Sequence, residues 1–391
     1  MQNFTRPFLY LLVVVSVFVS SCNRTNTEPT PDNQFLVSSS LIGDFSREQL
    51  IQRVDPTFAA FLPNGIKVYK IVYKTKNTDG KEINASGAVM FPNKTGNLPL
   101  ISVQHGTITD DREAPSYYAT NSEANAAGSL LASQGFIVAY PDYIGYGASN
   151  NLPHPYEHRE SLASASLDML RATREFVRQE KIAWDNRLYI AGYSEGGFAT
   201  LALQKKIEEE TGTEFNLRAS SCGSGAYDKT ATMKYLVNSR TTGSVSSNQL
   251  YLWVLLTYDR IYNLNRPTTA YFKAPWAAQI QTTRERTNVN VSLNTIFTDA
   301  FIKGLNDGTD TAFLNAIKDN DVYDWKPRTP TRLYHGDADD LVFYFNSVNA
   351  EKAMKARGAT NVTLIPLRGR NHTSGIQDFL LGTFDFFSTV Q

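Results

Sequence analysis

The chain has 391 residues, of which 42% are hydrophobic, so it is long enough for one large domain or two smaller ones. Its 38 Lys and Arg residues balance 38 Asp and Glu residues. This neutral total gives no reason to expect nucleic acid or an anionic membrane surface as a partner.

The N-terminal residues are typical of an export signal. Arg6 precedes an apolar run over residues 8–19, which is too short to span a membrane comfortably but suits the core of a signal peptide. Small residues follow directly before Cys22, and this pattern resembles the lipobox of bacterial lipoproteins, in which the cysteine becomes the lipidated first residue. An ordinary secretory signal with a chance cysteine is the alternative.

The sequence therefore predicts a signal peptide over residues 1–21, a flexible tether over 22–45 and a folded domain over 46–391. The lipoprotein resemblance implies a protein anchored through Cys22 in the bacterial cell envelope, on its periplasmic or outer-membrane face. Cys222 is the other cysteine of the chain, so a lipidated Cys22 leaves no intramolecular disulfide. We interpret Cys222, at the end of an apolar run, as a small core residue.

Apolar runs and amphipathic segments alternate from about residue 65 onward. Strands are predicted at residues 66–75, 85–91, 98–104, 136–140, 188–191, 217–222, 331–334 and 362–365, the first two as a hairpin. Helices are predicted at residues 161–180, 198–203, 345–357 and 376–387. This alternation is typical of a mostly parallel sheet with helices on both faces, in which catalytic groups lie beyond the carboxyl ends of the strands.

The alternation is interrupted by an insertion over roughly residues 225–326. The insertion is dense in aromatic residues, and because a bare loop of this length is uncommon, we expect it to form helices of its own. We predict a helical lid over the active site that supplies an apolar substrate pocket. The alternative is a subdomain whose aromatic residues pack only against one another.

Ser194 lies in the sequence Gly192-Tyr193-Ser194-Glu195-Gly196-Gly197, between a predicted strand and a predicted helix. This pattern resembles the nucleophile elbow of α/β-hydrolases. The tight turn pushes the serine hydroxyl clear of the sheet at a helix N-terminus, where negative charge is stabilised. A glycine-rich turn with an incidental serine is the alternative, so the downstream partners of Ser194 decide between the two.

A nucleophilic serine needs a base to take its proton and an acid to orient that base. In the α/β-hydrolase order both follow the serine, which leaves His335 and His372 among the five histidines. His335 directly ends a predicted strand, whereas His372 lies in a polar loop after the last strand, where an imidazole can reach the elbow. We predict His372 as the base.

The acid is expected on the loop after the preceding strand. The segment from His335 to Val342 resembles the H-G-x-x-D-x-x-V acid turn of many α/β-hydrolases, and this resemblance places Asp339 at the acid position. Asp337 and Asp340 are interpreted as turn formers or solvated charges. A calcium loop is disfavoured because the glycine and the distal glutamate of such loops are missing.

Two backbone N–H groups are expected to stabilise the oxyanion of the reaction. One is that of Glu195, directly after the serine. The second is expected from the loop His105-Gly106-Thr107, which is similar to the oxyanion loop of lipases and esterases. The Thr107 N–H is the favoured donor and that of Gly106 the next, while His105 is interpreted as a structural residue under the loop.

Two further segments resemble secreted lipase-like hydrolases of bacteria and fungi. Residues 141–147 match their P-D-Y-x-G-x-G loop, and His154-Pro155-Tyr156 is found in bacterial members. His154, Glu157 and His158 lack an evident third metal ligand, so we interpret them as hydrogen-bonding loop residues. Gly106, His105, Tyr193, Tyr146 and His154 are candidates for lining the site.

The resemblance, which covers most of residues 65–390, implies an α/β-hydrolase fold with a mostly parallel sheet and a helical lid. It implies a serine hydrolase that cleaves carboxylic esters through an acyl-enzyme, with no metal and no cofactor. The expected substrates are small-molecule, lipid or acylated-carbohydrate esters. The alternatives are a serine peptidase, an acetyl or feruloyl esterase acting on polysaccharide, and a non-catalytic hydrolase-like binding protein.

Overall fold

The computed structural model describes residue 1 and residues 33–54 and 56–390. The predicted signal peptide, Cys22 and the first part of the tether lie outside the described residues. Within them, nine strands form one sheet: β1 (Leu36–Phe45), β2 (Ile66–Lys76), β3 (Glu82–Pro92), β4 (Leu98–Gln104), β5 (Ile137–Pro141), β6 (Trp184–Tyr193), β7 (Asn216–Gly223), β8 (Thr331–Gly336) and β9 (Val362–Leu367).

The strand order is β1-β2-β3-β5-β4-β6-β7-β8-β9. The first three strands pair antiparallel, and β2 and β3 form the predicted hairpin with Ile66 opposite Pro92 and Lys76 opposite Glu82. From β5 to β9 every pairing is parallel. The predicted mostly parallel sheet is therefore confirmed, and β6, which leads into Ser194, lies at its centre.

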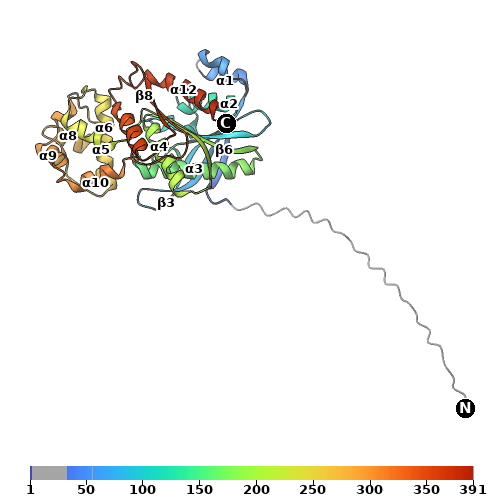
Figure 1. The fold of residues 1–391 in the computed structure, drawn as a ribbon, viewed down its shortest axis with the longest axis horizontal. Helices are drawn as coiled ribbons and strands as arrows, with labels where there is room; N and C mark the ends of the chain where they lie inside the picture. Colours follow the sequence, from blue (N-terminus) through green and yellow to red (C-terminus); the bar gives the residue numbers. More distant parts are fainter. Residues whose placement is uncertain (2–32, 55, 391) are drawn as a thin grey trace. The chain divides into compact units, whose positions relative to one another are not determined.

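Helices cover both faces of this sheet (Figure 1). Helices α3, α4 and α11 lie on one face, and α1, α2 and α12 lie on the other. The helices of the described residues are α1 (Arg47–Arg53), α2 (Ser129–Gln134), α3 (Arg159–Gln179), α4 (Glu195–Glu210), α5 (Lys229–Asn238), α6 (Val245–Ile261), α7 (Thr268–Tyr271), α8 (Trp276–Thr283), α9 (Asp299–Asn306), α10 (Thr311–Asp319), α11 (Phe345–Ala356) and α12 (Gly375–Thr389).

The central strands are buried on both faces, which explains their nearly continuous apolar sequences. Successive side chains point to opposite faces. In β4, Leu100 packs toward α3 and α4, whereas Ile101 packs toward α2 and α12. Leu188 and Tyr189 divide in the same way in β6. Cys222 is fully buried in β7, as predicted.

The predicted tether ends earlier than residue 45. Residues 36–45 form strand β1, which pairs with β2 from Leu36 opposite Tyr73 to Phe45 opposite Ile66. Most of its side chains are exposed, because it is an edge strand held mainly by backbone hydrogen bonds on one side. A strand of this kind needs no apolar alternation, so its serine-rich sequence resembles a linker.

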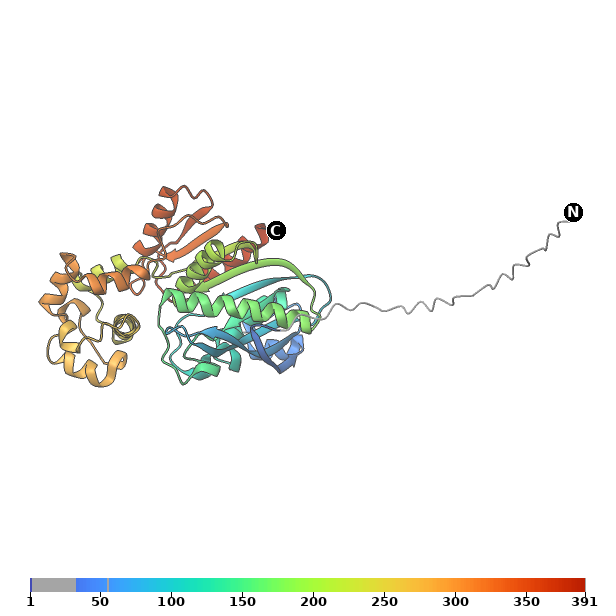
Figure 2. The same ribbon diagram turned by 90° about the horizontal axis from the view of Figure 1, so that it is seen from below.

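Helices α5 to α10 connect β7 to β8, so the insertion does form helices of its own. Its buried aromatic side chains build a separate core that includes Tyr258, Tyr271, Phe301 and Phe313. Figures 1 and 2 both show these helices as a lobe at one end of the sheet. Across the described part of the chain, no helix has the length and apolarity needed to cross a membrane.

Candidate active site

Ser194 occupies a strained turn between β6 and α4. Its φ of 61° and ψ of −124° lie in a region that residues other than glycine rarely adopt. The neighbouring glycines allow the turn, since a Cβ on Gly192 would lie 2.4 Å from the Gly196 carbonyl oxygen. One on Gly196 would lie 2.0 Å from the carbonyl oxygen of Gln104 on β4. The backbone therefore has the geometry predicted for the elbow.

The loops after β8 and β9 bring Asp339 and His372 to this serine. His372 Nε2 lies 2.9 Å from Ser194 Oγ, and His372 Nδ1 lies 2.7 Å from Asp339 Oδ2. Three side chains predicted from separate segments thus form one continuous hydrogen-bonded chain. In this arrangement the carboxylate accepts a hydrogen bond from the Nδ1–H group, which leaves Nε2 free to accept the proton of the serine hydroxyl.

The Asp339 carboxylate is buried and held in place from several sides. Its Oδ1 accepts hydrogen bonds from the backbone N–H groups of Leu341 and Val342, at 3.0 and 2.9 Å. Burial raises the pKa of Asp339, but hydrogen bonds from His335 and His372 outweigh this effect and lower the pKa well below its ordinary value. The carboxylate therefore stays ionised and fixed against the imidazole.

Two other candidate residues of this region, His335 and Asp337, do not take part in the hydrogen bonds to Ser194. His335 is fully buried beside Asp339, and its Nδ1 and Nε2 lie 2.7 Å from Ser347 Oγ and from the Val342 carbonyl oxygen, respectively. Asp337 accepts a hydrogen bond from the Gly369 N–H at 2.7 Å, which ties the acid turn to the loop that carries His372. Among the described residues, no group of three metal-ligating side chains is placed to hold an ion.

The two predicted oxyanion donors belong to the first turn of α4 and to the loop after β4. Glu195 is the first residue of α4, so its N–H has no carbonyl partner within the helix. The Gly106 N–H donates to Glu123 Oε1 at 3.1 Å, while the structure shows no hydrogen bond from the Thr107 N–H within the described residues. This distribution favours Thr107 over Gly106 as the second donor. The Thr107 hydroxyl is fixed by Tyr156 Oη at 2.8 Å.

Tyr193, which we expected to line the site, lies next to His372, with 5.4 Å between the centroids of the two rings. Its hydroxyl donates to the His372 carbonyl oxygen at 2.7 Å and accepts from Ser224 Oγ at 3.0 Å. Burial raises the pKa of Tyr193 to about 12, so the hydroxyl remains a donor at neutral pH. A residue of the elbow therefore positions the histidine loop.

His105, Tyr146 and His154, which we expected to line the site, lie behind it. His105 Nε2 is 3.1 Å from the Asp142 carbonyl oxygen, and Tyr146 donates to the Ile108 carbonyl oxygen at 2.6 Å. His154 Nε2 lies 2.7 Å from Oε1 of Glu195, and both side chains are buried. These residues hold the backbone of the oxyanion loop and of the elbow instead of facing a ligand.

Two residues that hold the loop His105-Gly106-Thr107 in place, Glu123 and Tyr143, were not predicted from the sequence. Glu123 binds the Gly106 N–H and accepts a hydrogen bond from Tyr140 at 3.0 Å. Tyr143 donates to the His105 carbonyl oxygen at 3.2 Å. The match of residues 141–147 to a known loop was the available signal for Tyr143, whereas no local pattern singles out Glu123.

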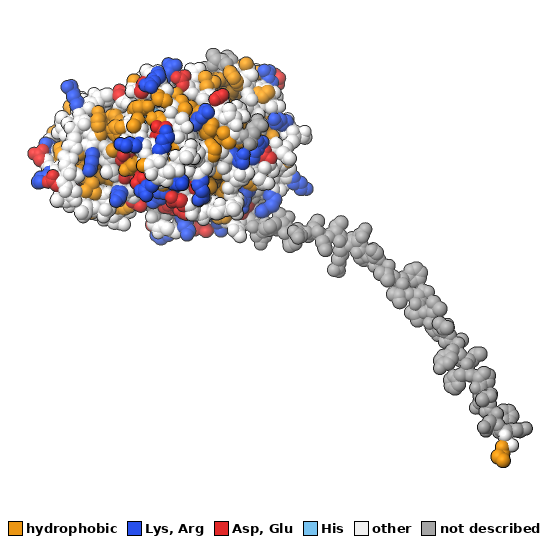
Figure 3. Space-filling view, in the orientation of Figure 1, with side chains coloured by type: hydrophobic (Ala, Val, Ile, Leu, Met, Phe, Trp, Pro, Cys, Tyr) orange, Lys and Arg blue, Asp and Glu red, His pale blue; other side chains and the backbone are white. Residues whose placement is uncertain are grey.

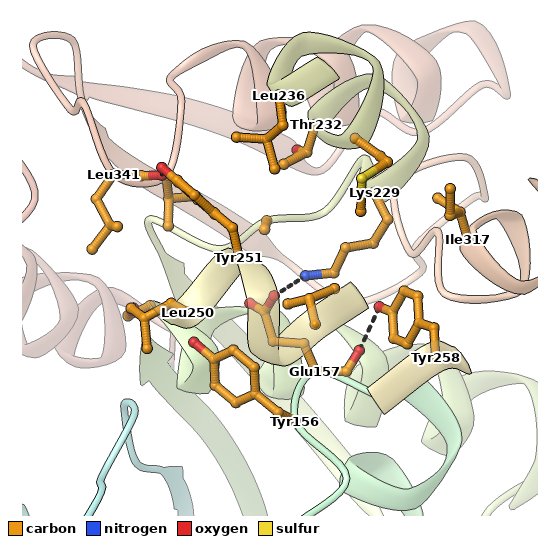
Figure 4. Close-up of a pocket in the computed structure, with 15 residues that line it drawn as sticks. Tyr156, Glu157, Lys229, Thr232, Leu236, Leu250, Tyr251, Tyr258, Ile317 and Leu341 are labelled. Atoms are coloured by element: carbon orange, nitrogen blue, oxygen red, sulfur yellow. Dashed lines mark hydrogen bonds and ion pairs between the residues drawn. The ribbon is translucent and has the colours of Figure 1, made fainter. Parts of the chain in front are cut away.

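Helices α5, α6 and α10 of the insertion contribute to a pocket beside Ser194 (Figure 4). This lid pocket measures only about 40 Å³. It contains a buried ion pair between Glu157 and Lys229, and Tyr258 donates to the Glu157 carbonyl oxygen at 2.8 Å. Burial raises the pKa of Glu157 and lowers that of Lys229, and each charge opposes the shift of the other. The predicted apolar substrate pocket is therefore small and partly charged.

Comparison with known proteins assigns the chain to a protein family. The model of the secretory lipase family matches residues 117–377, which is more than half of the chain. The chain belongs to the secretory lipase family. Lipase A of Moesziomyces aphidis is 25% identical to this chain over 226 residues, 54% of the chain, and the matched region spans only 46% of that lipase.

Solved structures share the α/β-hydrolase fold with this chain. A Legionella pneumophila protein assigned as a hydrolase has a TM-score of 0.80 at 25% identity, covering 91% of this chain and 98% of its own. The rice cell wall degrading esterase LipA of Xanthomonas oryzae has a TM-score of 0.73 at 23% identity, with coverage of 90% and 96%. Candida antarctica lipase A has a TM-score of 0.64 at 18% identity, with coverage of 90% and 83%.

Proposed function

We propose that this protein is a serine hydrolase that cleaves carboxylic esters through an acyl-enzyme on Ser194. The main observation in support is the pair of hydrogen bonds that links Ser194 Oγ to His372 and His372 to Asp339, with distances of 2.9 and 2.7 Å. The strained turn at Ser194 and the ionised, buried Asp339 support the same assignment.

In the acylation step, His372 Nε2 takes the hydroxyl proton as Ser194 Oγ bonds to the ester carbonyl carbon. The carbonyl oxygen becomes an oxyanion, which the N–H groups of Glu195 and Thr107 stabilise, and each such donor contributes on the order of 10²- to 10³-fold in kcat. The imidazolium then protonates the alcohol oxygen, the carbon–oxygen bond breaks, and the alcohol leaves.

In the deacylation step, water replaces the alcohol. His372 Nε2 takes a proton from the water as its oxygen bonds to the acyl carbon. Collapse of the second oxyanion breaks the bond to Ser194 Oγ, and His372 returns the proton to the serine. The free acid leaves, and the enzyme regains its starting protonation state.

The decisive test is a panel of p-nitrophenyl esters offered to the wild type, Ser194→Ala and His372→Ala. We expect the wild type to hydrolyse at least the short esters and both variants to lose about 10³-fold or more of kcat. A fluorophosphonate should add one equivalent to the wild type, located at Ser194 by peptide mass spectrometry, and none to Ser194→Ala. Failure of the wild type to cleave any ester would reject the esterase assignment. Peptide cleavage alone would favour a peptidase.

We also propose that Cys22 carries a lipid anchor, which rests on the sequence before it. Metabolic labelling with a fatty-acid probe should mark the wild type, whereas Cys22→Ala should remain unlabelled. A labelled Cys22→Ala variant, or an unlabelled wild type, would reject the anchor without affecting the esterase assignment.

A further inference from the structure

A second cavity, much larger than the lid pocket, also borders Ser194 and shares Leu250 and Leu341 with the lid pocket. It measures about 680 Å³ and runs between the sheet and helices α2 and α12. We call it the sheet-face groove. Its apolar wall includes Val103, Leu130, Leu131, Ala191, Phe379 and Leu380.

One end of the groove is the candidate active site, and the other end lies near the N-terminal elements. Ser194, His372 and Thr107 are on its wall at the active-site end. Phe58 and Phe61 of the 3-10 helix η1 (Pro56–Phe61) are on its wall as well. A chain covalently attached to Ser194 Oγ can therefore enter the groove without crossing another element.

The wall suits a hydrocarbon. Glu123 is the only Lys, Arg, Asp or Glu side chain among the described residues of the wall, and its carboxylate already binds the Gly106 N–H. Along the rim, Phe61, Ile376 and Leu381 keep 50%, 41% and 50% of their surface exposed, which is unusually high for large apolar residues grouped at one opening. Figure 3 shows hydrophobic side chains gathered on the part of this face where α12 and α2 lie in Figure 1.

The two cavities differ in what they can hold. The lid pocket, with about 40 Å³ and a buried ion pair, has room for a water molecule or a small polar group. The sheet-face groove has a volume within the usual range of about 300–1,000 Å³ for ligand sites. Only the groove can take a long apolar chain.

We propose that the sheet-face groove binds the acyl chain of the ester, so that the enzyme acts on medium- and long-chain esters while the lid side receives the small leaving alcohol. This inference rests on the proposed ester hydrolysis at Ser194. We expected the substrate pocket in the aromatic insertion, whereas this proposal assigns the selection of acyl-chain length mainly to helices α2 and α12.

The test compares acyl chain lengths in the wild type and in Ala127→Trp. Ala127 is a half-buried residue of the groove wall, so a tryptophan there should block the groove beyond the first few carbons. Ala353→Trp is the matched control, because Ala353 is a half-buried alanine on α11 that borders neither cavity. Circular dichroism melting of each variant monitors the fold.

For the wild type we expect kcat/KM of p-nitrophenyl esters to rise by up to about fourfold per added methylene, or on the order of 10²-fold from butyrate to octanoate. Ala127→Trp should lose most of this rise, and Ala353→Trp should keep it like the wild type. A flat wild-type profile, or an unchanged profile in Ala127→Trp, would overturn the groove assignment while leaving the esterase assignment intact.

Two further experiments complete the test. One measures binding without turnover, and the other distinguishes the acyl side of the ester from the alcohol side. Ser194→Ala should bind p-nitrophenyl decanoate more tightly than the acetate by calorimetry, and adding Ala127→Trp should remove the difference. Equal binding of the two esters would overturn the proposal even if no hydrolysis occurs. Acetate esters of increasing alcohol length form the last arm, and a rate increase there that Ala127→Trp abolishes would assign the groove to the alcohol instead.

Discussion

Replacement of Asp339 by asparagine is the sharpest single test of the proposed mechanism. The exchange keeps the shape of the side chain and removes its charge. In the wild type, Oδ1 accepts from the Leu341 and Val342 N–H groups, and Oδ2 accepts from His372 Nδ1 at 2.7 Å. An asparagine can keep both backbone hydrogen bonds through its carbonyl oxygen, so the turn should persist.

The amide NH₂ group of the asparagine must then face His372. Because NH₂ donates, Nδ1 has to accept, and the ring proton moves to Nε2. Nε2 lies 2.9 Å from Ser194 Oγ and can no longer take the serine proton. An aspartate-to-asparagine exchange in a serine protease triad lowers kcat by about 10⁴-fold, which corresponds to about 5 kcal/mol of barrier.

The assay is steady-state hydrolysis of a p-nitrophenyl ester by Asp339→Asn, with Asp337→Asn as the matched control. Asp337 lies two residues earlier, and an asparagine there can still accept the hydrogen bond of the Gly369 N–H. Only the exposed ion pair with Arg368 is lost, so the exchange should leave kcat within about threefold. A kcat of Asp339→Asn within tenfold of the wild type, with an unchanged melting temperature, would refute the assigned role. An equal loss in Asp337→Asn would show that turn distortion alone explains the effect.

Three further predictions concern buried groups outside the reacting chain. Burial lowers the pKa of His158 from 6.5 to about 4. The folded state therefore favours the neutral imidazole, and this contribution to the free energy of unfolding is fully present above pH 6.5. It decreases by up to about 3 kcal/mol as the pH falls toward 4. His158 is the N-cap residue of α3, and its side chain accepts a hydrogen bond from the Ser161 N–H. His158→Asn retains such an acceptor and should flatten the pH dependence in urea unfolding series between pH 4 and 8. An unchanged slope would contradict its assignment to His158. Lys229→Met should lower the free energy of unfolding by about 3–5 kcal/mol, because it leaves the buried Glu157 carboxylate without its partner. Adding Glu157→Gln should restore most of the lost free energy. A double variant that is no more stable than Lys229→Met would argue against the Glu157–Lys229 ion pair. Burial raises the pKa of the Cys222 thiol to about 12, so a thiol reagent at pH 8 should label the Cys22→Ala protein only in denaturant. Labelling of the native form would show that β7 opens.

Much of the fold was predictable because its signals are local. The apolar runs of β4 and β9 and the amphipathic pattern of α3 could be read from short windows, since buried strands and half-buried helices differ in periodicity. Strand β1 was not predictable in this way. Its serine-rich sequence meets the requirements of an edge only in combination with β2, which lies more than twenty residues away.

The sequence by itself determined which side chains are candidates for chemistry. Ser194, Asp339 and His372 each lie in a turn whose glycines and polar residues have a local physical reason, so their segments could be recognised one by one. The tertiary structure decided that these turns meet within hydrogen-bonding distance. It also decided that Glu123 accepts the hydrogen bond of the Gly106 N–H, and that the large cavity lies mainly between the sheet and helices α2 and α12. A cavity is the space left by elements far apart in the chain, and its size depends on how their side chains pack, which no local pattern records.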